Sequence, residues 1–171
     1  MRTKKSRDKE KTGGGKDLFE LLNFNAAGKW TGEWEELEIT VDSGAAESVA
    51  PESFAKGFQL MESEGSKVGQ IYTTADGTEI PNMGEKKIEM WTKEGNPGEV
   101  TFQIAKGVAK PLGSVKKMCQ AGNQVVFDDS GSYVVNKATG KKTWLEEKNG
   151  IYIMKVQIPK APVFAGLGTL I

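Results

Sequence analysis

The chain has 171 residues, 23 Lys and Arg against 23 Asp and Glu, no histidine and one cysteine. The lack of histidine excludes Ser-His-Asp and Cys-His hydrolases and histidine-ligated metal sites, while the single Cys119 excludes intrachain disulfides and thiolate zinc clusters. A net charge of zero argues against a global field for nucleic acid. No apolar run reaches membrane-spanning length and no apolar segment leads the chain, so we expect a cytoplasmic, intracellular protein without membrane contact.

The first third of the chain divides into a basic tail, a short apolar stretch and one strand. Residues 1–16 carry seven basic and two acidic side chains and almost nothing apolar, a composition typical of a disordered tail. The apolar stretch 18–24 predicts one or two helical turns. Partial alternation over 33–41 predicts a strand that enters a sharp turn. Residues 51–56 predict a short helix with a proline in its first turn.

The rest of the chain is predominantly β in character. Strands are predicted over residues 70–74, 87–91, 100–104, 124–127, 132–136 and 151–158. A helix is predicted over 114–121, because Ser114 can cap its start and Gly122 can end it. The pattern thus predicts a domain over 17–122, a β-hairpin region appended over 123–160, and a tail over 161–171.

A strand that runs directly into Asp42-Ser43-Gly44-Ala45 is the strongest candidate for chemistry. Gly44 permits a tight backbone, and Ser43 can tie the loop down by hydrogen bonds. Together they would present the Asp42 carboxylate at a rigid bend. The alternative to a catalytic role for Asp42 is an ordinary solvated turn aspartate between a strand and a helix.

Two further features follow in an order that makes mechanical sense. The turn centred on Asp76 and Gly77 predicts a hairpin that can lie over a substrate, although an ordinary surface hairpin has the same pattern. Leu112-Gly113 then precedes the predicted helix, where Gly113 can also serve only as a helix-entry glycine.

Residues 39–50, Ile-Thr-Val-Asp-Ser-Gly-Ala-Ala-Glu-Ser-Val-Ala, resemble the active-site segment of retropepsins, the aspartic proteases of retroviruses and retrotransposons. The hairpin at 70–84 stands where that family has its flap. Leu112-Gly113 stands where the family has a hydrophobic-hydrophobic-Gly element before a helix, with Pro111 in place of the usual first aliphatic residue.

The resemblance covers about 28–122 and continues to about Pro159. The downstream part is similar to the region between protease and integrase in copia-type retrotransposon polyproteins. The segments that carry this similarity are Gly113–Met118, Gly122, Val125–Asp128, Thr139–Lys141 and Asn149–Tyr152.

The resemblance implies a mainly β fold, a small closed barrel of the acid-protease type with a flap hairpin, one short helix towards its C-terminal side and the appended β-hairpin region. It implies an aspartic endopeptidase that processes a retrotransposon Gag-Pol polyprotein, without any cofactor or metal. The implied site residues are Asp42 as the catalytic carboxylate, Ser43, Gly44 and Ala45 as loop support, Thr74, Ala75, Asp76, Gly77 and Thr78 as the flap, and Leu112 and Gly113 as the hydrophobic-Gly element.

Hydrolysis of a peptide bond by carboxylates alone needs two of them, because two close carboxylates share one proton, so that one activates water while the other donates to the carbonyl oxygen. One chain supplies one such aspartate, so we expect a homodimer in which Asp42 meets its own copy. The other partner is an extended peptide bound through strand-like hydrogen bonds. A weaker hypothesis makes residues 1–16 an RNA-contacting segment that acts through phosphates.

Three alternatives compete with this interpretation. Asp129-Ser130-Gly131 would place both aspartates on one chain, but the acidic Asp128 precedes it and only 40 residues follow, so a hairpin turn is favoured. A catalytically silent retropepsin-like module for dimerisation or peptide binding stays open. A cellular retropepsin-like protease of the ubiquitin-shuttle kind is disfavoured by the copia-like segments.

Overall fold

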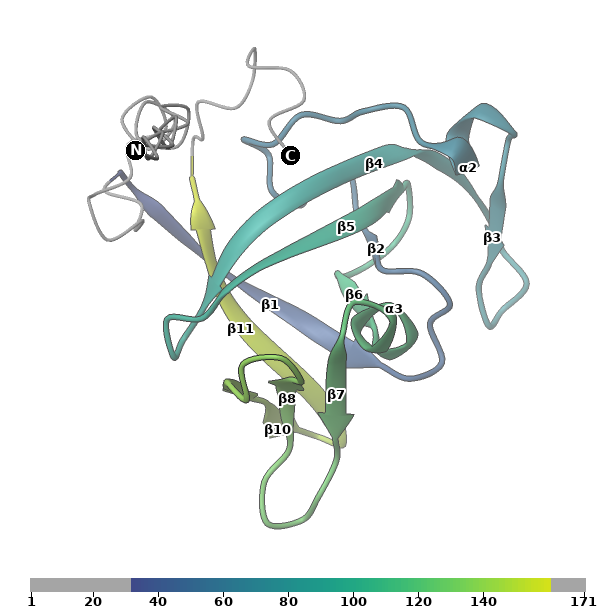
Figure 1. Ribbon diagram of the computed structural model, residues 1–171. Coiled ribbons are helices and arrows are strands. Elements are labelled where there is room, and N and C mark those ends of the chain that lie inside the picture. The colour runs from purple at the N-terminus through teal and green to yellow at the C-terminus, as the bar shows by residue number, and fades with distance from the viewer. Residues whose placement is uncertain (1–31, 161–171) are drawn as a thin grey trace, which may run out of the picture.

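The computed structural model of the protein describes residues 32–160, and within them it is mainly β with two short helices (Figure 1). The elements are β1 (Trp34–Asp42), β2 (Val49–Ala50), α2 (Glu64–Lys67), β3 (Ile71–Thr73), β4 (Glu79–Thr92), β5 (Pro97–Ala105), β6 (Leu112–Ser114), α3 (Val115–Gln120), β7 (Asn123–Val126), β8 (Tyr133–Asn136), β9 (Lys142–Trp144), β10 (Glu146–Lys148) and β11 (Ile151–Pro159). The predictions for residues 1–16, 18–24 and 161–171 lie outside the described residues. No helix within the described range is long and apolar enough to cross a membrane.

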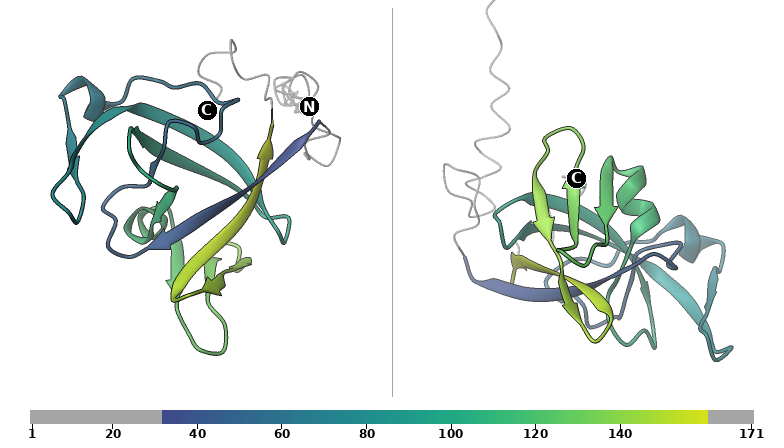
Figure 2. Two further views of the ribbon diagram at one scale, coloured as in Figure 1. Left: turned by 180° about the vertical axis from the view of Figure 1, so that it is seen from behind. Right: turned by 90° about the horizontal axis from the view of Figure 1, so that it is seen from below.

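The strands form two sheets. The larger is mixed and has the order β10-β11-β1-β6-β2-β5-β4-β3, with an additional pairing between β11 and β4. The smaller is antiparallel with the order β7-β8-β9. Seen from below, α3 and the small sheet, in green, stand on one side of the larger sheet (Figure 2).

The larger sheet wraps around the main apolar core. Ile39, Ile88, Phe102, Ile104 and Ile158, from four different strands, are fully shielded from solvent. These β-branched and aromatic side chains favour strands because they pack well on a pleated surface. The core therefore holds β1, where the candidate site begins, against β4, β5 and β11.

β4 is much longer than the strand predicted over 87–91. Its side chains alternate between exposed or half-buried and buried along most of its length, but two of the inward positions are Asn82 and Lys86. Because these are polar, the hydropathy pattern did not show the first half of the strand. The amide of Asn82 instead makes hydrogen bonds at 2.9–3.1 Å with Gln70, Tyr72 and Gln103, and so joins the base of the β3–β4 hairpin to β5.

The helix predicted over 51–56 is wrong, because the segment forms a series of turns. Ala55 has φ of +49°, a value outside the right-handed helix. The buried Lys86 amine also donates to the carbonyls of Phe54 and Ala55, at 2.8 and 3.2 Å, and so ties these turns to β4. Burial lowers the pKa of Lys86.

The prediction of an appended hairpin region over 123–160 is wrong for its second half. β7–β9 form the small sheet, but β11 pairs with β1 along eight residues of the main sheet. The reason lies in its alternation, since Met154, Val156 and Ile158 bury their side chains in the main core. β9 and β10 were not predicted.

Candidate active site

Asp42 is the last residue of β1 and is half-buried. β1 lies between two neighbours, antiparallel β11 and parallel β6, and Asp42 is in register with Ser114 of β6. Ile39 and Val41, at 0% and 5% exposure, anchor the end of the strand in the core. The carboxylate is therefore positioned by a strand that is hydrogen-bonded on both sides.

The turn after Asp42 is closed by the carboxylate itself. The amide of Gly44 donates to Asp42 Oδ1 at 2.7 Å. A Cβ on Gly44 would lie 3.3 Å from that same oxygen, closer than most real Cβ contacts, so glycine suits this approach. Ser43 is exposed, and its hydroxyl makes no hydrogen bond to any residue in 32–160. The loop support expected from Ser43 thus comes from Gly44 in the single chain.

Two buried serines brace the loop from behind. Ser114, fully shielded, donates from Oγ to the carbonyl of Ala45 at 2.6 Å and accepts from the amide of Lys117 at 3.2 Å as the N-cap of α3. The Ser114 amide donates to Oγ of Ser48 at 3.0 Å. One hydroxyl thus links the Asp42 loop to the start of α3, a role beyond the predicted cap.

Leu112 and Gly113 lie directly beside the end of β1. Leu112 is in register with Thr40 of β1 and with Val49 of β2, so it joins the two strands that flank the loop. A Cβ on Gly113 would lie 2.8 Å from Met118 Cε and 3.0 Å from Ile39 Cγ2. Gly113 is therefore required for the close packing of α3 against β1, which is more than a helix-entry role.

Pro111 departs from the retropepsin pattern without disturbing this arrangement. Its carbonyl accepts a hydrogen bond from the Thr40 amide at 3.0 Å. Proline keeps this acceptor, and it lacks only the amide donor.

The 74–78 segment forms the tip of the β3–β4 hairpin, as predicted. Gly77 has φ of +84°, and its amide donates to the Thr74 carbonyl at 2.9 Å. The Asp76 carboxylate accepts hydrogen bonds from the Thr74 hydroxyl and the Thr78 amide, which lower its pKa to about 2. Ala75, like its neighbours, is exposed. A cavity lies beside Asp42, and none of the described residues that line it belongs to the 74–78 tip.

A cavity of about 490 Å³ opens beside Asp42. Its lining includes Asp42 and Ser43 from the loop and Leu112 from β6, so it brings together three of the predicted site residues. It also includes side chains that the sequence did not assign to the site: Lys110, Phe127, Ile151 and Tyr152. No local pattern marks residues 151–152 as site residues, because only the β1–β11 pairing brings them to the end of β1.

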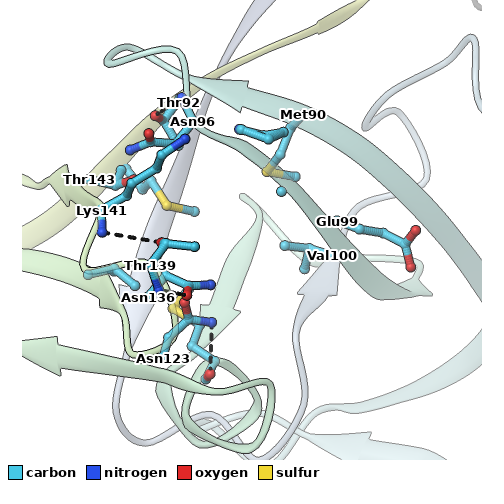
Figure 3. Close-up of a pocket in the computed structure, with 15 residues that line it drawn as sticks. Met90, Thr92, Asn96, Glu99, Val100, Asn123, Asn136, Thr139, Lys141 and Thr143 are labelled. Atoms are coloured by element: carbon cyan, nitrogen blue, oxygen red, sulfur yellow. Dashed lines mark hydrogen bonds between the residues drawn. The ribbon is translucent and has the colours of Figure 1, made fainter. Parts of the chain in front are cut away.

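A second cavity, of about 350 Å³, lies between the β4–β5 hairpin and the small sheet (Figure 3). Met90, Met118 and Met154 line it together with the rim residues Asn96 and Asn136. None of the predicted site residues is among its described lining residues, so it is separate from the cavity at Asp42.

The chemistry open to the Asp42 site is that of a carboxylate with hydroxyls, amides and one nearby ammonium group. Within residues 32–160, no group of three or more acidic or cysteine side chains is placed to hold a metal ion. In comparisons with known proteins, no family model, no curated protein and no solved structure matches this chain significantly.

Proposed function

We propose that the protein is an aspartic endopeptidase of the retropepsin type, active as a homodimer. The observation that carries the proposal is the Asp42 loop: a carboxylate at the end of a core strand, closed by the Gly44 amide and braced by Ser114 from the parallel strand β6. A surface turn aspartate needs none of this support. The residue types and their order agree with the retropepsin active-site segment and its hydrophobic-Gly element.

The strand order supports the acid-protease barrel as the fold. Six strands follow one another as β11-β1-β6-β2-β5-β4, and the β11–β4 pairing links the two ends of this series through Val156 with Thr92 and Gln157 with Trp91. A series of strands whose ends pair with each other is the arrangement of a closed barrel.

The reaction needs two copies of Asp42 across a two-fold axis. One carboxylate accepts a proton from water, and the oxygen of that water attacks the peptide carbonyl carbon. The protonated Asp42 of the partner subunit donates to the carbonyl oxygen, and the tetrahedral intermediate collapses with a proton delivered to the leaving amine. The 74–78 tip would act as the flap over an extended peptide, and the natural substrate would be a retrotransposon polyprotein processed inside the cell.

The test is cleavage of peptides by the purified chain over a dilution series. Asp42→Asn should lower the cleavage rate by at least about a hundredfold, because a carboxylate that transfers protons contributes about that much or more. The rate per chain should also fall on dilution, and pepstatin should inhibit it.

Asp129→Asn is the matched control, since Asp129 also begins an Asp-Ser-Gly sequence but is exposed in a turn. Cleavage that survives Asp42→Asn would contradict the proposal. A chain that dimerises and binds peptides without cleaving them would instead be the silent module.

A further inference from the structure

Residues late in the chain contribute an aromatic wall to the cavity at Asp42. Phe127 follows β7, and Tyr152 lies near the start of β11. Both line this cavity together with Asp42. Their rings contact each other, with centroids 4.5 Å apart and planes tilted by 42°.

The main sheet holds this wall in place. Tyr152 is in register with Val41, the residue that precedes Asp42. The turn before β11 has φ of +53° at Asn149 and +75° at Gly150, the left-handed pair found in a tight two-residue hairpin turn. This turn fixes where β11 begins. It therefore also fixes that Tyr152 is the residue paired with Val41, next to the Asp42 loop.

The wall also has room in front of it. Phe127 is 41% exposed although it is large and apolar. Gly150 lines the same cavity, and a Cβ added there would meet nothing within 4 Å. An apolar group that filled this space would remove the exposed ring face from water, which is favourable in proportion to the area covered.

We propose that Phe127 and Tyr152 form a subsite for an aromatic side chain of the substrate, next to the peptide bond that is cleaved. The inference rests on the proposed function, since it takes the scissile bond to lie at Asp42. Adjacent residues of an extended peptide are about 3.3 Å apart, so only a residue near the scissile bond can reach a wall that shares a cavity with Asp42. A third ring joins the tilted pair favourably, because edge-to-face contacts between aromatic rings add to simple burial.

The proposal makes the region after α3 part of the substrate-binding site. Specificity would then depend on a segment that lies outside the protease-like residues 28–122. Removal of residues 123–160 would take away the subsite along with β11.

The experiment uses one peptide series that differs only in the residues flanking the scissile bond, with Phe, Leu or Ala there. The full chain should cleave the Phe peptide with a kcat/KM roughly tenfold to a hundredfold above that of the Ala peptide. Phe127→Ala should abolish most of this ratio, and Phe127→Leu, which keeps the apolar volume without the ring, should leave the Phe and Leu peptides nearly equal. Trp144→Ala is the control, because Trp144 is an aromatic residue with 51% exposure that does not line the cavity.

Binding of the same peptides to the Asp42→Asn protein separates this proposal from the proposed function. A Phe preference that Phe127→Ala removes from binding, in a protein that cleaves nothing, would sustain the subsite and overturn the protease. An unchanged Phe-to-Ala ratio in Phe127→Ala would overturn the subsite while leaving the protease intact. No binding and no cleavage of any peptide would overturn both.

Discussion

Replacement of Ser114 by alanine tests whether the Asp42 loop is held from behind. Ser114 is fully buried, and its hydroxyl makes two hydrogen bonds, to the Ala45 carbonyl and from the Lys117 amide. Loss of a helix N-cap costs about 1 kcal/mol, and loss of a second buried hydrogen bond costs about as much again. We therefore expect Ser114→Ala to lower the free energy of unfolding by about 2 kcal/mol.

A chemical denaturation series measures this loss directly. For a chain of this size, about 2 kcal/mol corresponds to a fall in Tm of roughly 4 to 8 °C. The loop should loosen as well, so the Gly44 amide, which donates to Asp42, should exchange its hydrogen faster in the variant. Peptide cleavage should fall with it, because the carboxylate loses its fixed position.

Ser63→Ala is a matched control. Ser63 is also buried and caps a helix, α2, by accepting from the Ser66 amide at 3.1 Å. Ser63 Oγ also donates to Asn82 Oδ1 at 3.3 Å, so Ser63→Ala should lower stability by a similar amount but leave the exchange of the Gly44 amide hydrogen unchanged. The reasoning is refuted if Ser114→Ala changes stability by less than about 0.5 kcal/mol, the range of neutral surface substitutions. If stability falls but the Gly44 amide hydrogen exchanges at the same rate, then Ser114 does not hold the Asp42 loop in place.

Two further substitutions test packing and charge. Gly113→Ala should lower stability by about 1 to 3 kcal/mol, because the new Cβ meets Ile39 Cγ2 at 3.0 Å in a filled core. Glu99→Gln should raise stability by about 0.2 to 1 kcal/mol at neutral pH, since Glu99 stands directly across the β4–β5 pair from Glu89 and like charges there repel. Burial, and then the Glu99 carboxylate, raise the pKa of Glu89 above its ordinary value of 4.5, so the folded state holds its proton to higher pH than the unfolded state.

The sign of the pH dependence follows from that shift. The contribution of Glu89 to stability is fully present below pH 4.5 and is lost as pH rises through its folded pKa. The gain from Glu99→Gln should therefore appear at neutral pH and vanish when both carboxyls are protonated, as measured by denaturation at several pH values. A gain that persists at low pH would show a cause other than charge.

For Gly113→Ala, the control is Gly98→Ala, where the nearest atom to a new Cβ lies at 4.0 Å. Equal losses of stability at both positions would contradict the packing argument.

Local chemistry was enough to predict several elements. The strand before Asp42, the hairpin turn at Asp76 and Gly77, and the helix capped by Ser114 were all predicted, and all three are present. Each depends on alternation, turn residues or capping, which act over a few neighbouring residues. The positions of Leu112 and Gly113 were singled out by their order in the chain, while the contacts that they make with Thr40 and Ile39 were not.

Tertiary structure decided the features that depend on distant pairs. The polar residues Asn82 and Lys86 face inward on β4 only because Gln103 and the carbonyl of Phe54 are there to satisfy them, so hydropathy alone could not extend that strand. β11 was predicted in the appended β-hairpin region, but it pairs with β1 in the main sheet, and this pairing brings Tyr152 next to the Asp42 loop. The amino-acid sequence by itself determined which carboxylate stands at the end of a strand. Only the folded chain decided what surrounds it, because strand pairing joins residues whose separation along the chain leaves no local pattern.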